Sequence, residues 1–376
     1  MNSVLAAKDY PTNMLAHRWL GDLTMPKIRL VSQFAVDRPD RVQICERLLE
    51  SYNLAIRDEG RSPLKREGED LWSQILRNEF PKILAAIENG DARQLSTELM
   101  TFGNSPVWFG GLTTGLDGFN WKNKNPEWVA LTYYDQLLSI GEYMGIIQAP
   151  IPEESSGAAN FSVDINELVD RIEKKLEFNI LPPTGVVPVL GLQVHHGALN
   201  YRHLLGLYGA LRICDLAANY YPIVEFGGGL GITALYARRM GFADYTLLDL
   251  PISCLFAGHF LINSLGDNNV VLYGEKLSGP TIKILPYWEC QNLSSKKYCL
   301  SVNQDGLPEM ADNFIHEYLK QIRRITNGVF LSINHDGFFP RTVHQFINSS
   351  GGFKRIYRAR CFVREGFIEE AYKILS

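Results

Sequence analysis

The 376-residue sequence lacks the features that would place a protein in a membrane, on nucleic acid or outside the cell. Its six cysteines are scattered without a C-x-x-C pair, which is typical of reduced thiols in a cytoplasmic protein. No apolar run approaches the roughly 18 residues of a membrane span, and the first residues do not resemble a signal peptide. A formal net charge of −4 gives no broad basic surface, so we expect neither nucleic acid nor membrane as a partner.

A complete dinucleotide-binding fingerprint is also missing, although glycines cluster near the middle of the chain. Gly227, Gly228, Gly229 and Gly231 fall within five residues. Counting Gly-x-Gly-x-x-Gly from Gly227 or from Gly228 places another residue where a glycine is required. This spacing argues against an NAD-linked dehydrogenase.

Two short apolar segments flank these glycines, and each ends at an acidic residue. The first ends at Glu225, an amphipathic run follows over residues 232–240, and a second apolar segment, residues 245–248, ends at Asp249. Strand, glycine turn, helix and strand in this order predict half of a mononucleotide-binding unit. The glycines allow a ligand to approach the backbone, the helix start favours an anionic group, and Asp249 can accept both hydroxyls of a ribose.

More strands are expected toward the C-terminus. Residues 298–302 and 329–333 predict the fourth and fifth strands, and the third is either 270–273 or 282–288. Residues 353–363 fit an antiparallel pair that closes the sheet. Ligands of open α/β sheets bind beyond the carboxyl ends of the strands, so a reacting group is expected among the polar residues found there. These residues are Asn303, Asp305, Glu309, Asn334 and His335.

The N-terminal half shows helical periodicity and no identifiable chemistry. Helices are expected over residues 41–59, 71–80, 83–87, 92–99, 127–147 and 166–178. Gly60 is expected to end the first helix, and Asp91 to cap the fourth. We expect a mainly α-helical domain over residues 1–190, serving as a substrate cap or a dimerisation domain, and a nucleotide-binding domain over residues 191–376. The helical half would allow a homodimer.

Two further features have alternative interpretations. The glycine- and aromatic-rich stretch 101–125 predicts either a substrate lid, with Trp108 as a stacking surface, or an Ω-loop packed on its own aromatics. His195 and His196 could anchor a substrate, act as a base, or supply half of a metal site, but the sequence shows no third ligand. We therefore predict no metal site, although Asp305, Glu309 and Asp336 leave carboxylate ligation open.

The pattern Glu225-x-Gly227-x-Gly229-x-Gly231, with Asp249 at the end of the next strand, resembles the S-adenosylmethionine (SAM) signature of class I methyltransferases. Together with the segments LLDLP, NQDGLPEM and FLSINH, it makes the region from about residue 190 to 376 similar to a bacterial family of sugar O-methyltransferases.

The resemblance implies a Rossmann-like sheet of seven strands with the last strand antiparallel. It also implies SAM as cofactor and S-adenosylhomocysteine as product, with Glu225 near the methionine ammonium and Asp249 on the ribose. A ring just after the third strand, Tyr287 or Trp288, is expected beside the adenine. The expected cofactor-binding residues are Glu225, Gly227, Gly229, Gly231, Asp249, Leu250, Tyr287 and Asn303.

Family membership would further imply methyl transfer to a hydroxyl of a sugar or a glycosylated natural product. We expect His335 as general base, because the unperturbed pKa of imidazole is about 6.5. His195 or His196 is the reserve, and Asp305 or Glu309 could act instead or hold the sugar hydroxyls. The expected acceptor-binding residues are His195, Glu309, Asn334 and Trp108. An N- or C-methyltransferase and a non-catalytic SAM-binding subunit are the alternatives.

Overall fold

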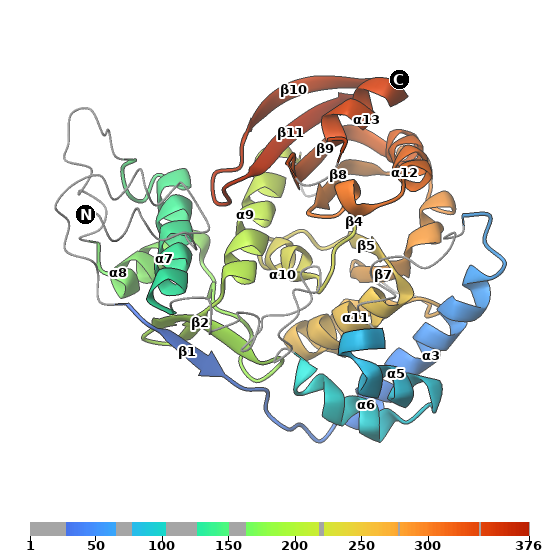
Figure 1. The fold of residues 1–376 in the computed structure, drawn as a ribbon, viewed down its shortest axis with the longest axis horizontal. Helices are drawn as coiled ribbons and strands as arrows, with labels where there is room; N and C mark the ends of the chain where they lie inside the picture. The colour runs from blue at the N-terminus through green and yellow to red at the C-terminus, as the bar shows by residue number, and fades with distance from the viewer. Residues whose placement is uncertain are drawn as a thin grey trace.

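The computed structural model describes residues 28–64, 77–102, 126–149, 163–217, 222–276, 279–337 and 340–375. These residues form a small antiparallel sheet and a large, mostly parallel sheet flanked by helices (Figure 1). The small sheet has the order β1-β2-β3, and the large one has the order β10-β11-β9-β8-β4-β5-β7-β6. No helix among the described residues is long and apolar enough to cross a membrane.

The strands of the small sheet are β1 (Leu30–Gln33), β2 (Val189–Val194) and β3 (Gly197–Leu199). Those of the large sheet are β4 (Ile223–Phe226), β5 (Tyr245–Asp249), β6 (Val270–Leu272), β7 (Ile282–Pro286), β8 (Tyr298–Gln304), β9 (Thr326–His335), β10 (Phe353–Arg360) and β11 (Phe367–Ile374). The helices of the N-terminal half are α3 (Arg41–Glu59), α5 (Pro81–Glu88), α6 (Ala92–Leu99), α7 (Pro126–Tyr143) and α8 (Ile165–Leu176).

The later helices are α9 (Tyr201–Leu216), α10 (Ile232–Arg239), α11 (Pro251–Leu265), α12 (Asp312–Ile325) and α13 (Val343–Ser350). Short 3-10 turns are η2 (Asp267–Asn269), η3 (Tyr287–Gln291) and η4 (Leu307–Glu309). The predicted end of α3 before Gly60 is confirmed, and so is the cap at Asp91, whose side chain accepts the backbone N–H of Gln94 at 2.9 Å.

The large sheet confirms the Rossmann-like arrangement but not the expected number of strands. Within the described residues it contains eight strands, not seven, because both candidates for the third strand are strands. β7 pairs with β5 and takes the third position, whereas β6 pairs with the outer edge of β7 and adds the eighth strand. The sequence contains two short apolar segments for the one predicted third strand, and each segment pairs with a neighbouring strand.

The closing strands differ from the prediction as well. The last strand, β11, runs antiparallel to both β9 and β10, as expected, but it lies beyond the predicted 353–363 segment. Asn327 and Gly328, residue types that are common at helix ends, already belong to β9. α12 ends at Ile325, and the chain enters the strand at once because Thr326 adopts an extended backbone.

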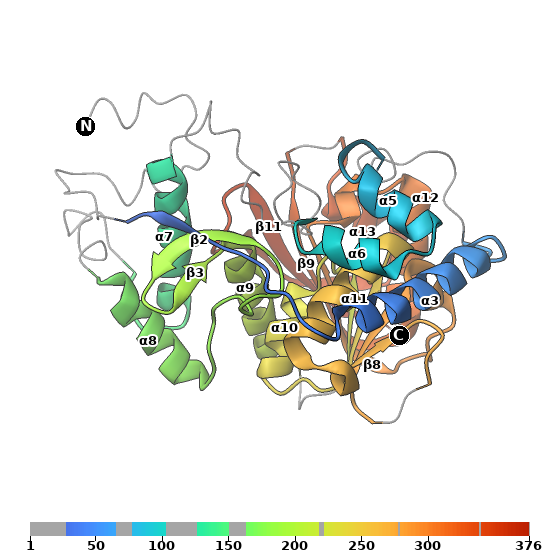
Figure 2. The ribbon, with the colours of Figure 1, turned by 90° about the horizontal axis from the view of Figure 1, so that it is seen from below.

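The N-terminal elements lie in two groups at different ends of the layer formed by helices α9, α10 and α11 (Figures 1 and 2). α3, α5 and α6 lie near α11, whereas α7, α8 and the small sheet lie on the side of α9. Buried side chains of both groups and of helices α9 to α11 belong to one hydrophobic cluster. The expected division between residues 190 and 191 falls inside β2, which pairs with β1 and β3.

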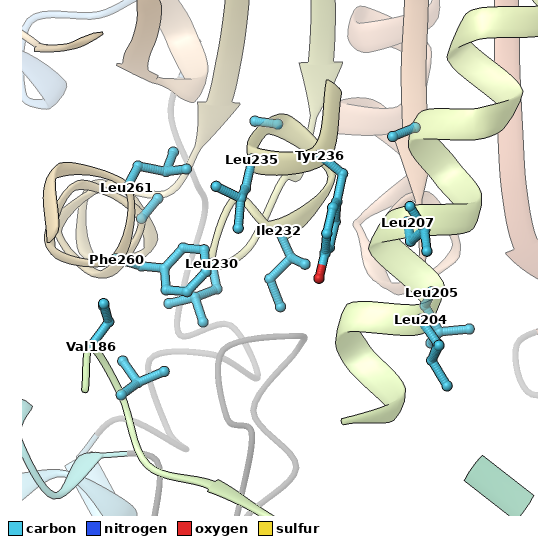
Figure 3. Packing of buried hydrophobic residues seen from close by; sticks show 14 of the residues in the cluster. Val186, Leu204, Leu205, Leu207, Leu230, Ile232, Leu235, Tyr236, Phe260 and Leu261 are labelled. Carbon is cyan, nitrogen blue, oxygen red and sulfur yellow. The ribbon is translucent and has the colours of Figure 1, made fainter. Parts of the chain in front are cut away.

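Helix α10 is held between α9 and α11 by apolar side chains (Figure 3). Ile232 and Tyr236 face the leucines of α9, and Leu235 lies on the side of Phe260 of α11. All of these side chains are buried, and burial of each large apolar side chain contributes about 1.5–3 kcal/mol. This packing fixes the start of α10, and with it the glycine loop that leads into the helix.

Candidate active site

The glycine loop leaves β4 and enters α10 with three glycines in the left-handed region. The φ angles are 78° at Gly227, 56° at Gly229 and 82° at Gly231. Residues with a Cβ rarely adopt these angles, so the sequence requires glycine here. At Gly231 a Cβ would also lie 2.7 Å from Cδ1 of Leu261. The loop therefore exposes backbone, rather than side chains, to the space above β4.

Asp249, at the end of β5, binds this loop directly. Its Oδ2 accepts the backbone N–H of Gly229 at 2.8 Å, and its Oδ1 accepts the N–H of Leu250 at 2.7 Å. Burial raises the pKa of Asp249 to about 6, although these two hydrogen bonds oppose the shift. Each carboxylate oxygen retains a second lone pair, so the group can still accept ligand hydroxyls.

Glu225, at the end of β4, is a buried acid beside the same loop. Its side chain is 2% exposed, and its Oε2 accepts the hydroxyl of Tyr245 at 2.8 Å. Burial raises the pKa of Glu225 to about 7. Because burial disfavours the charged form of this carboxyl group, a cationic ligand beside it would stabilise the carboxylate and lower its pKa.

Asn303 and Asn334 lie together at the ends of β8 and β9 and bind mainly each other and the backbone. Asn303 Nδ2 donates to the Phe226 carbonyl at 2.7 Å, and its Oδ1 accepts from Asn334 Nδ2 at 2.9 Å. Asn334 Oδ1 accepts the N–H of Gly306 at 3.0 Å. These contacts hold the ends of β8 and β9 and the turn after β8 in place. Both amides therefore position the backbone of the site.

Asp305 follows β8 with a φ of 56° and carries two arginine partners. Arg364 Nη1 lies 2.6 Å, and Arg202 Nη1 3.5 Å, from Asp305 Oδ2. Burial alone would raise the pKa of Asp305, but the two guanidinium groups outweigh it and the net shift is downward. Asp305 is therefore a permanently ionised acid that joins α9, β8 and the β10–β11 loop.

Glu309 and His335 complete a cluster with Asp305. One ligand atom from each of the three side chains lies within 4.8 Å of the other two. Burial, reinforced by the negative charge of Asp305, raises the pKa of Glu309 to about 7. Burial lowers the pKa of His335, which Asp305 only partly offsets. The imidazole is thus neutral at pH 7 and able to accept a proton.

A cavity beside the glycine loop reaches this cluster at Asp305. Its lining comes from the start of α9, the loop, the start of α10 and the end of β8. The lining residues are Arg202, Leu205, Gly206, Glu225, Gly227, Gly228, Gly229, Leu230, Ile232, Thr233, Gln304, Asp305 and Arg364. The lining holds both acids and arginines, which suits a ligand that carries charges of both signs.

The other predicted site residues lie elsewhere or outside the described chain. Leu250 is the N-cap residue of α11, next to Asp249. Tyr287, after β7, is buried with its hydroxyl 3.0 Å from Glu59 Oε1 of α3. Trp108 lies outside the described residues. His195 and His196 lie in the β2–β3 turn against α8, and are not part of the Asp305 cluster.

Arg202 and Arg364 were missed by the sequence analysis. Each is far in sequence from Asp305, and no motif links an arginine at the start of one helix with an acid after a distant strand. The only available signal was the position of Arg202 in a polar stretch just before the nucleotide-binding unit. Arg202 and Arg364 contact Asp305 only in the folded chain, so the sequence alone does not show that they pair with this acid.

No family model matches this chain, and no curated protein matches it. Solved structures do resemble part of it. A TehB-like SAM-dependent methyltransferase from Corynebacterium glutamicum has 15% identity over 44% of this chain and 87% of that chain, with a TM-score of 0.36. A SAM-dependent methyltransferase from Aquifex aeolicus has 12% identity over 46% and 92%, with a TM-score of 0.33.

A geranyl diphosphate C-methyltransferase from Streptomyces coelicolor, solved with Mg²⁺, geranyl diphosphate and S-adenosylhomocysteine, is also similar. It has 11% identity over 46% of this chain and 79% of that chain, with a TM-score of 0.37. Because the identities and TM-scores are low, the functional argument depends on the residues of this chain.

Proposed function

We propose that this chain is a SAM-dependent methyltransferase acting on a hydroxyl of a polyhydroxylated small molecule, namely a sugar or a glycosylated metabolite. The observation that carries the proposal is a cavity lined by the glycine loop, by Glu225 and by Asp305. Asp249 binds the glycine loop directly, and Asp305 forms a cluster with Glu309 and His335 next to the cavity.

The side chains around the glycine loop fit the polar parts of SAM. Glu225 offers a carboxylate to an ammonium group, and Arg202, which also lines the cavity, offers a guanidinium to a carboxylate. Asp249 offers acceptor oxygens to ribose hydroxyls. SAM itself supplies an electrophilic methyl group when bound, so the protein mainly has to align the acceptor oxygen.

His335 is the best general base among the described residues of the cluster. Its neutral imidazole can take the proton of an acceptor hydroxyl, and the ionised carboxylate of Asp305 stabilises the imidazolium that results. Glu309, with a pKa of about 7, can either donate to or accept from a sugar hydroxyl. Such a set of groups suits a polyol better than an apolar acceptor.

The N-terminal elements beside α9 are proposed to form the acceptor side of the site. Tyr133 of α7 packs on Tyr201, with ring centroids 5.3 Å apart, and Arg202 lies over the Tyr201 ring at 4.9 Å. This chain of contacts links α7 to the arginine that lines the cavity. A substrate cap placed there would adjoin Asp305 directly.

We expect cofactor binding to release a proton through Glu225. Its pKa of about 7 means that roughly half of the free protein carries this proton at pH 7, and a bound ammonium group would lower that pKa. The affinity for S-adenosylhomocysteine should therefore rise with pH up to about 7 and then level off. Calorimetric titrations in buffers of different ionisation enthalpy measure the released proton directly.

The control for this prediction is Glu225→Gln, which keeps an acceptor for the Tyr245 hydroxyl but cannot titrate. This variant should bind more weakly and show no proton release around pH 7. Equal proton release from the variant and the wild type would show that another group titrates.

Methyl transfer itself can be tested with methyl-labelled SAM and a panel of free sugars, glycosides and nucleotide sugars, with amines as the comparison set. The proposal expects label in a methyl ether of a hydroxylated acceptor and one S-adenosylhomocysteine per methyl group. Label that enters only amines would overturn the hydroxyl assignment. SAM binding without transfer to any member of the panel would favour a non-catalytic subunit.

A further inference from the structure

The β2–β3 turn and helix α8 bring three metal-ligating side chains together outside the candidate active site. Asp170 comes from α8, and His195 and His196 form the turn between the paired residues Val194 and Gly197. One ligand atom from each of the three lies within 4.8 Å of the others. Figure 2 shows α8 beside this hairpin. The sequence indicated the histidine pair, and folding supplies the missing third ligand.

We propose that Asp170, His195 and His196 form a binding site for a divalent transition-metal ion, with Zn²⁺ as the best match. Two imidazoles and one carboxylate are ligands that suit Zn²⁺, and an exposed face leaves the fourth position to water. The His195 Nε2 to Asp170 Oδ1 distance is 3.2 Å. Two ligand atoms at about 2.0–2.2 Å from a tetrahedral Zn²⁺ are separated by about 3.4 Å, so the pair is already spaced for a shared ion.

The orientation of His195 supports a cation between these atoms. The backbone N–H of His195 donates to Asn166 Oδ1 at 2.7 Å, which identifies that atom as an acceptor oxygen. The Nδ1 of His195 lies 2.9 Å from the same oxygen and must therefore be its donor. In the neutral ring, Nε2 is then a lone-pair acceptor, and it faces another acceptor, Asp170 Oδ1. A metal ion at this point would be ligated by both atoms in place of their direct contact.

Asn166 also provides the outer contact that commonly orients a metal-binding histidine. It lies one turn before Asp170 on the same face of α8, and the Asp164 side chain fixes that first turn by accepting the N–H of Asn166 at 2.9 Å. The hairpin pairing fixes the position of the two histidines from the other side. A bound ion would join α8 to the small sheet, and because the unfolded chain lacks this arrangement, it would raise the melting temperature.

The test is titration of the full-length, chelator-treated protein with Zn²⁺, and with Co²⁺ as a spectroscopic probe of coordination. We expect one Zn²⁺ bound at this site with a rise in melting temperature, and a visible Co²⁺ absorption spectrum typical of nitrogen and oxygen ligands. His196→Ala and Asp170→Asn should each weaken binding at least tenfold, and Asn166→Ala should weaken it by about 10–100-fold through loss of the outer contact.

Two controls separate this site from other metal-binding residues. His316→Ala removes a histidine of α12 that bonds to Ser350, and should leave Zn²⁺ affinity unchanged. Glu309→Gln alters the second cluster among the described residues whose geometry could hold an ion, and should also leave the first Zn²⁺ in place. No saturable Zn²⁺ binding, binding retained in His196→Ala, or binding lost only in Glu309→Gln would each overturn the proposal.

Discussion

Replacing His335 with alanine should lower kcat by about 10²–10⁴-fold with any hydroxyl acceptor, because that is the usual contribution of a positioned general base. The binding of S-adenosylhomocysteine should change little, since His335 belongs to the Asp305 cluster and does not line the cavity beside the glycine loop. Burial lowers the pKa of His335 below its ordinary value of about 6.5. The rate should therefore be constant across neutral pH and fall only when acid protonates the imidazole.

The measurement is the pH profile of kcat for the wild type, for His335→Ala and for His316→Ala as the matched control. The control should retain the wild-type rate and the wild-type profile, because its imidazole lies on α12 beside Ser350. Full activity of His335→Ala would remove the base from the mechanism. It would also favour a neutral nitrogen as the acceptor atom, which requires less help from a base.

Replacing Asp249 with alanine should weaken S-adenosylhomocysteine binding about 10²-fold or more. Each hydrogen bond to a charged group contributes about 1.5–3 kcal/mol, and a ribose would form two with this carboxylate. The variant also leaves the N–H groups of Gly229 and Leu250 without their acceptor, which loosens the glycine loop. Both effects act in the same direction, so two further variants separate them.

Asp249→Asn retains an oxygen that can accept the Gly229 N–H, and should lose less affinity than Asp249→Ala. Asp244→Ala removes an acid just before the other end of β5, where the carboxylate pairs with Lys283 at 2.6 Å, and should bind with wild-type affinity. Melting temperatures of all three variants show whether the sheet itself is intact. Equal affinities of Asp249→Ala and the wild type would contradict the assignment of Asp249 to the ribose.

The parts of the fold and site that the sequence predicted are those with local signals. The glycine loop needs positive φ angles that only glycine adopts easily, and both acids directly follow apolar strands, so Glu225 and Asp249 could be located by counting. His335 could be placed by the same argument, at the end of a strand.

The remaining parts depend on contacts between distant segments. Arg364 reaches Asp305 across 59 residues, and Asp170 meets the histidine pair only because α8 packs beside the β2–β3 hairpin. Strand β6 lies at an edge, where pairing with β7 rather than composition decides that it is a strand. Asn303 was predicted as a cofactor-binding residue, yet in the described structure its amide is occupied by contacts with Phe226 and Asn334.

Calorimetric titration of the wild-type protein with S-adenosylhomocysteine, with NAD as the comparison ligand, tests the central claim most directly. The glycine loop, Glu225 and Asp249 predict one site of micromolar affinity for S-adenosylhomocysteine and no binding of NAD. Binding of NAD in its place, or no binding of S-adenosylhomocysteine at all, would contradict the assignment of this cavity to SAM.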